Sequence, residues 1–151
     1  MYRTLLAGAV LLATAVTPVL AHEPVSVRSV EAEFTDVVTD LEDAVINRGY
    51  VVDYHGYIGE MLQRTAEDVG SEKQLYRNAE FIQFCSAVLS REMMEADIGN
   101  IAFCPYVLFA YETEAEPGKV VVGFRELPEG LGRDAINMLL DEIVREVTGE
   151  E

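Results

Sequence analysis

The stretch YVLFAYETEAEPGKVVVGFR, residues 106–125, decides the fold. Residues 106–111 and 120–125 are rich in β-branched and aromatic side chains, which favour extended strands. Between them lies Glu116-Pro117-Gly118, a combination typical of a turn. The stretch therefore predicts a β-hairpin with a long loop, and a hairpin pairs its two strands antiparallel.

Two long amphipathic helices are predicted on either side of this hairpin in the sequence. The first lies between the candidate N-cap Thr35 and Gly49, a residue type that often ends helices. The second covers residues 133–147, where Ile, Leu and Val form one apolar stripe. Shorter elements are expected as strands over residues 25–30, 50–58 and 81–86, as helices over 60–69 and 90–96, and as a helical turn after a Ser71–Gln74 capping box.

This order of elements predicts an α+β fold, because the strands run together and the long helices lie near the two ends. We expect a single two-layer domain over residues 22–151. Its mainly antiparallel sheet of about four to five strands carries both long helices on one face. The other face is then free for a ligand or a second subunit, and a homodimer is one assembly that the fold allows.

Residues 1–21 have the pattern of a secretory signal peptide. Arg3 supplies the positive start, residues 5–20 are almost uninterruptedly apolar, and small-residue cleavage is expected after Ala21. No comparable apolar stretch follows. The sequence therefore predicts a soluble periplasmic protein of a Gram-negative bacterium, with no membrane association once the signal peptide is removed.

The formal net charge of −16 restricts the partners of the chain. Binding to a phosphate backbone requires clustered Lys and Arg, so the charge argues against nucleic acid. A cationic periplasmic protein is a compatible partner. The alternative is that the charge only keeps the protein soluble.

Cys85 and Cys104 are the two cysteines of the chain, and export would place them in an oxidising compartment. If the strands next to them are neighbours, the pair lies within reach of a disulfide. The sequence leaves four alternatives open: a structural disulfide, a functional thiol or persulfide site, soft-metal ligation, and inert buried thiols. A CxxC motif is absent, so a thioredoxin-type dithiol is not supported.

A soft-metal site would use Cys85 and Cys104 together with Met94 and His55, and copper is the metal that thiolate and thioether suit. Met93 and Met94 would also shape a ligand pocket, although methionines at helical spacing are commonly core residues.

His55 is expected on a strand face shared with Val51, Asp53 and Tyr57, and paired with Asp53. Its alternative role is that of a hydrogen-bonded structural residue. Tyr76 and Arg91 flank the first cysteine and would favour an anionic group, with solvation at the surface as the alternative.

Motifs of common enzymes are absent from the sequence, including GxSxG, HExxH, the P-loop and CxxCH. No Asp/Glu pair can be singled out as an acid–base couple. These observations favour a non-enzymatic protein and imply no particular cofactor.

Residues 81–86 (FIQFCS), 97–99 (DIG) and 103–112 (FCPYVLFAYE) together resemble the domain-of-unknown-function family numbered 302. Cys85 and Cys104 fall on its two cysteine positions, and the likeness spans roughly residues 25–126. The resemblance implies a small α+β fold similar to the β-α-β-sheet-α arrangement of TATA-binding protein, often dimeric. It links exported members to sulfur-compound oxidation or respiration.

We therefore expect a periplasmic non-enzymatic binding or accessory protein, in which the Cys85/Cys104 region receives a small ligand, a sulfur species or a soft metal. One alternative is a thiol–disulfide or sulfur-transfer component of a sulfur-oxidation or respiratory pathway. The other is an acidic domain with a structural disulfide that docks a cationic partner.

Overall fold

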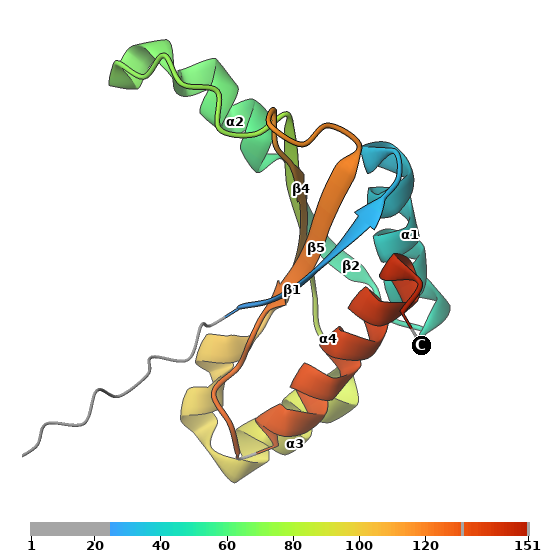
Figure 1. The fold of residues 1–151 in the computed structure, drawn as a ribbon. Helices are drawn as coiled ribbons and strands as arrows, with labels where there is room; N and C mark the ends of the chain where they lie inside the picture. Colours follow the sequence, from blue (N-terminus) through green and yellow to red (C-terminus); the bar gives the residue numbers. More distant parts are fainter. Residues whose placement is uncertain (1–24, 131, 151) are drawn as a thin grey trace, which may run out of the picture.

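Five strands form an open antiparallel sheet in the computed structural model, which describes residues 25–130 and 132–150 (Figure 1). The strand order is β1-β5-β4-β3-β2, and every neighbouring pair is antiparallel. The predicted hairpin is formed by β4 and β5, in which Leu108 lies opposite Phe124. The strands are β1 (Val25–Glu31), β2 (Val52–Gly56), β3 (Asn78–Phe84), β4 (Tyr106–Glu112) and β5 (Lys119–Arg125).

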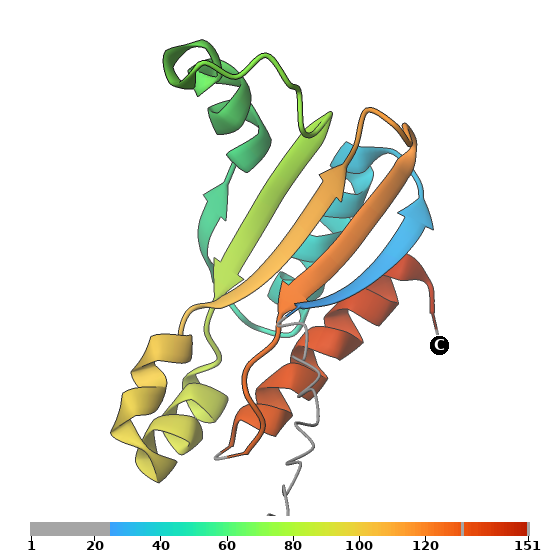
Figure 2. The same cartoon turned by 60° about the vertical axis from the view of Figure 1, so that its left-hand side comes forward.

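Two long helices, α1 (Phe34–Asn47) and α4 (Arg133–Thr148), cover one face of this sheet. In Figure 2 both helices lie behind the strands. Their apolar stripes meet the inward-facing strand residues, and each such side chain contributes about 1.5–3 kcal/mol when fully buried. The α+β expectation, with both long helices on one face, is confirmed. The core includes Val37, Leu41, Val45, Ile82, Phe84, Leu108, Val122, Phe124, Ile136, Leu140 and Ile143.

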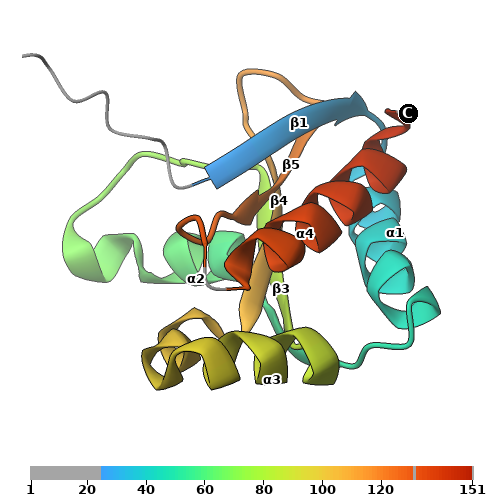
Figure 3. The same cartoon turned by 90° about the horizontal axis from the view of Figure 1, so that it is seen from below.

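The segment between β2 and β3 stands on the opposite side of the sheet (Figure 3). It consists of α2 (Ile58–Thr65) and the short 3₁₀ helix η1 (Glu67–Val69). The helical turn predicted after Ser71 is wrong, since residues 71–76 have no regular structure. The Gln74 side chain does not close a capping box, because it donates instead to Glu114 Oε1 at 2.8 Å, on the β4–β5 loop.

The segment between β3 and β4 lies at one end of the sheet and consists of α3 (Ala87–Ala96) and η2 (Ile98–Phe103). Ser86, expected as the last strand residue, is the N-cap of α3, and its Oγ accepts from Leu89 N at 3.3 Å. The strand therefore ends at Phe84 and the helix begins three residues earlier than predicted. The Asp97 carboxylate caps η2 by accepting a hydrogen bond from Gly99 N at 2.8 Å.

Among residues 25–130 and 132–150, no helix is both long enough and apolar enough to cross a membrane. The predicted signal peptide, residues 1–21, lies outside the described residues.

Candidate functional site

Cys85 and Cys104 form a disulfide bond. Cys85 directly follows β3, and Cys104 lies two residues before β4. Because Phe84 and Tyr106 are paired across the two strands, the cysteine Cα atoms lie 6.4 Å apart, within the range of a disulfide. In this state neither sulfur is a thiolate, so the pair does not offer the ligands that a soft metal needs.

The disulfide is half-buried and lies next to a buried polar pair. Ser90 Oγ lies 2.7 Å from the Tyr106 hydroxyl and 3.7 Å from Cys104 Sγ. Burial raises the pKa of Tyr106, while the hydrogen bond to Ser90 opposes that shift. A largely apolar pocket of about 620 Å³ includes Cys85, Val88 and Leu89.

The structure does not bring the predicted pocket residues to the cysteines. Met93 is fully buried in the core, and Arg91 is exposed on α3 with Glu95 as its ion-pair partner at 3.3 Å. Tyr76 precedes β3 whereas Cys85 follows it, and the seven residues of that strand separate them by roughly 20 Å. Met94 lies half-buried on α3 and, like the other three, does not line the pocket beside Cys85.

His55 lies between two carboxylates, neither of which is Asp53. Its Nδ1 is 2.8 Å from Glu42 Oε1 and its Nε2 is 2.6 Å from Glu80 Oε2. The predicted pairing with Asp53 is wrong because the β2 register shifts between Val52 and Tyr54, which puts His55 on the helix-covered face. Within the described ranges, no three or more His, Cys, Asp or Glu residues are grouped to hold a metal.

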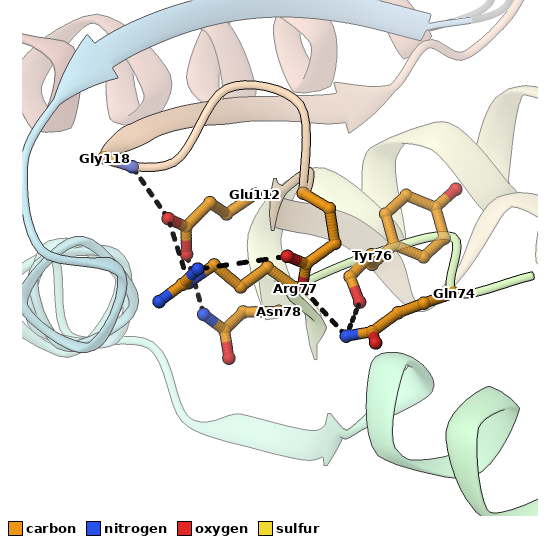
Figure 4. A network of polar contacts seen from close by, with 7 residues as sticks. Gln74, Tyr76, Arg77, Asn78, Glu112 and Gly118 are labelled. Atoms are coloured by element: carbon orange, nitrogen blue, oxygen red, sulfur yellow. Dashed lines mark hydrogen bonds and ion pairs between the residues drawn. The ribbon is translucent and has the colours of Figure 1, made fainter.

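A polar network that the sequence analysis did not identify lies at the end of β4 (Figure 4). Glu112 is 6% exposed and accepts hydrogen bonds from Asn78 Nδ2 and Gly118 N, each at 2.7 Å. The Gly118 hydrogen bond lowers the pKa of the Glu112 carboxyl, with further contributions from Asn78 and the nearby Arg77. In the strand alternation, Glu112 falls on the same face as the buried Leu108 and Ala110. This spacing was the signal in the sequence that could have predicted its burial. The network fastens the β4–β5 loop to the start of β3, and both carboxylate oxygens are engaged.

The sheet face that α1 and α4 do not cover, here called the open face, carries aromatic side chains across neighbouring strands. Phe109 of β4 lies opposite Phe81 of β3, and Tyr111 lies opposite Ala79 in the next outward row. The Tyr111 ring is nearly parallel to the Phe109 ring, with the two centroids 6.4 Å apart. It also contacts the Tyr76 ring edge-on, at a centroid distance of 5.5 Å. These rings give the open face a continuous apolar surface.

A groove of about 440 Å³ runs over this surface and is called the outer groove below. One end is closed by α2, which stands on this side of the sheet (Figure 3). The other end reaches Arg125, the last residue of β5. A free sheet face was expected from the sequence, and Tyr76 is the one lining residue that was predicted as part of a pocket, although for a pocket at Cys85. The lining residues used in the argument below include Leu62, Tyr76, Phe81, Phe109, Tyr111 and Arg125.

Two glycines let the phenyl rings lie close to the sheet. A Cβ atom on Gly123 would come within 2.7 Å of Phe109 Cζ and would also meet the Ser26 carbonyl oxygen. A Cβ atom on Gly56 would overlap the Phe81 ring. The groove floor therefore depends on the absence of side chains at these two positions.

The fold and the site define a class of protein: a small α+β domain with an open antiparallel sheet, a disulfide joining the ends of adjacent strands, and an apolar groove on the uncovered face. Residues 25–148 match the family described as "Domain of unknown function DUF302". The chain belongs to the DUF302 family.

A solved structure has the same fold. It is the crystal structure of an uncharacterized conserved DUF302 protein from Bacillus stearothermophilus, with a TM-score of 0.67 and 14% sequence identity. The match covers 84% of this chain and 99% of that one. No curated protein matches the chain. The comparisons thus establish the family and the fold.

Proposed function

We propose that the protein is a non-enzymatic binding or accessory protein of the periplasm, and that its ligand site is the outer groove. The observation that carries the proposal is that β4 has apolar or aromatic side chains on both faces from Tyr106 to Tyr111. An antiparallel sheet with one solvated face alternates apolar and polar residues. In β4 the outward Val107, Phe109 and Tyr111 break that alternation, so the open face is suited to contact with something apolar.

The shape and lining of the groove support a small ligand. Its volume of about 440 Å³ lies within the range of small-molecule sites, roughly 300–1,000 Å³. Aromatic rings offer apolar molecules a large contact area. In this groove β4 holds the rings of Phe109 and Tyr111 in fixed positions relative to one another, and the Tyr76 ring contacts that of Tyr111. Among the described residues, the groove lining contains no Ser, Cys or His, and its one carboxylate, Glu80, is paired with His55. Its residues are therefore suited to holding a molecule rather than transforming it.

A second candidate is the thiol–disulfide component that the sequence analysis kept open. It is favoured by the half-buried position of Cys85 and by the apolar pocket of about 620 Å³ beside it. A ligand or partner seated on Val88 and Leu89 would lie against the disulfide. The two candidates use different surfaces, so one experiment separates them.

That experiment is a titration of ¹⁵N-labelled protein with octan-1-ol, an uncharged apolar probe, followed by amide chemical shifts. We expect the shifts to change around Phe81, Phe109 and Tyr111. Phe109→Ala removes the central ring and should weaken binding about fivefold or more, or about 1 kcal/mol. The matched control is Val88→Ala, an exposed apolar residue beside the disulfide, which should leave binding unchanged.

Shift changes centred on Cys85 and Val88, together with loss of binding in Val88→Ala, would favour the second candidate. Absence of any saturable shift change would overturn the proposal that the outer groove binds a small apolar molecule.

A further inference from the structure

We infer that the outer groove selects a small amphiphilic anion: a monocarboxylate with an apolar chain of medium length, whose carboxylate pairs with Arg125. This inference rests on the proposed function, because it specifies the ligand chemistry of the same groove. It adds Arg125 as a specificity-determining residue, because apolar side chains alone do not distinguish a charged ligand from an uncharged one.

Arg125 occupies an outward position on β5, one residue beyond the Leu108–Phe124 pair. Across the sheet it lies opposite Val25 of β1, so its strand neighbours are apolar. Among the described residues, its guanidinium makes no ion pair and no hydrogen bond, whereas Arg28 and Arg77 each contact two carboxylates. Arginine presents several donors in a planar fork that matches a carboxylate. Arg125 therefore offers an unoccupied anion contact at the end of an apolar groove.

The open face is also depleted of acidic residues. The chain has 27 Asp and Glu, yet among the described residues Glu31 is the single carboxylate on the outward positions of β1, β3, β4 and β5. Asp53 lies in the irregular part of β2, the strand at the far edge of the sheet from β1 and β5. Glu31 lies opposite Lys119, at the end of the sheet away from Arg125. Glu80 also borders the groove, but its carboxylate is engaged with His55 at 2.6 Å. Within the described part of the chain, the one carboxylate that lines the groove is thus already paired with His55 rather than with Arg125.

The strongly negative net charge does not prevent anion binding at this position. At physiological ionic strength the Debye length is about 8 Å, so carboxylates on the helix-covered side of the sheet are largely screened. The guanidinium of Arg125 then determines which ligand charge is preferred at this end of the groove, and it favours an anion. The net charge does oppose the alternative occupant, because a second copy would bring another formal charge of −16 against the first.

The spacing of the sheet sets the length of the ligand. From Arg125 to Val121, which lies opposite Tyr111, the strand runs four residues, or about 13 Å. A ligand whose head group pairs with Arg125 can lay its chain over Phe109 and reach Tyr111. Octanoate is a suitable probe because it has a carboxylate and a single flexible apolar chain.

The test compares three probes of equal chain length by calorimetry and amide shifts: octanoate, octan-1-ol and octyltrimethylammonium. We expect wild-type protein to prefer octanoate over octan-1-ol by about five- to tenfold at low salt, with the cation weakest. Arg125→Gln should abolish that preference and leave octan-1-ol binding unchanged. The matched control is Arg91→Gln, an exposed arginine on α3, which should keep the wild-type preference.

Equal binding of octanoate and octan-1-ol, unaffected by Arg125→Gln, would overturn this inference and leave the proposed function standing. Failure of all three probes to bind would overturn both. If sedimentation then showed a stable dimer that Phe109→Ala dissociates, a second copy of the chain would be the occupant of the open face.

Discussion

The ring of Phe109 lies directly over Gly123 of the neighbouring strand, so close that a Cβ atom on the glycine would be 2.7 Å from Phe109 Cζ. A backbone position without a side chain thus fixes where an aromatic ring rests. The same relationship holds between Phe81 and Gly56. Together these two pairs shape the floor of the outer groove.

Gly123→Ala should therefore affect stability and binding together. The added methyl group meets both the Phe109 ring and the Ser26 carbonyl oxygen, and such overpacking typically costs about 1–3 kcal/mol. Urea unfolding should show the loss, and octan-1-ol should bind more weakly because the ring is displaced. Ser29→Ala, at another outward strand position, is the control and should stay within about 0.5 kcal/mol of wild type. An unchanged midpoint for Gly123→Ala would contradict the described contact.

Removing the disulfide should separate stability from ligand binding. The Cys85→Ser/Cys104→Ser double variant should lose about 2–4 kcal/mol of unfolding free energy, since the bond closes a loop across 19 positions. Its affinity for octan-1-ol should remain that of wild type, because the outer groove does not include the cysteines. Wild-type protein treated with a thiol reductant should behave like the variant. Lost binding in a folded double variant would move the ligand site to the cysteine region.

Glu112→Gln should destabilise the protein in a pH-dependent way. The folded-state pKa of this carboxyl is lowered, so its ionised form contributes stability above the ordinary value of 4.5. That contribution disappears as the pH falls through the lower folded pKa. We expect a loss of about 1–3 kcal/mol at pH 7, and a smaller difference from wild type near pH 3. Glu114→Gln, which replaces an exposed carboxylate of the same network, should show a weaker effect at both pH values.

His55→Gln should destabilise the junction of α1 with the edge of the sheet, because the imidazole touches Glu42 on the helix and Glu80 on β3. A loss of about 1–3 kcal/mol is expected for a broken, partly buried hydrogen-bonded group. Combining it with Glu80→Gln should cost less than the sum of the two single changes, because both remove the same contact. Thermal unfolding of the four proteins in this cycle measures the coupling. Strict additivity would mean that His55 and Glu80 do not interact.

The regular elements could be predicted because each has a strong local pattern. Residues 106–125 contain both a turn and two strand-forming runs, and the apolar stripes of α1 and α4 have clear helical spacing. For Cys85 and Cys104 the sequence allowed a disulfide if their strands were neighbours, and the β3–β4 pairing meets that condition. In these cases the information lies within one element or between adjacent elements.

The errors arose where a distant contact or an irregularity decided the outcome. Gln74 is held by Glu114, 40 residues later, so the local capping pattern did not form a helix. A single register shift in β2 turned His55 to the other face of the sheet. Tyr76 was grouped with Cys85 by closeness in sequence, although an extended strand places them at opposite ends. The outer groove required the strand order, which the sequence did not supply.

The disulfide also makes residues 85–104 a covalently closed ring between the end of β3 and the start of β4. A protease that cuts once inside this ring opens the loop but releases no fragment. The two pieces stay joined through sulfur, and only reduction separates them on a gel. The ring can thus be nicked in a proteolytic environment while the strands on either side remain parts of one molecule.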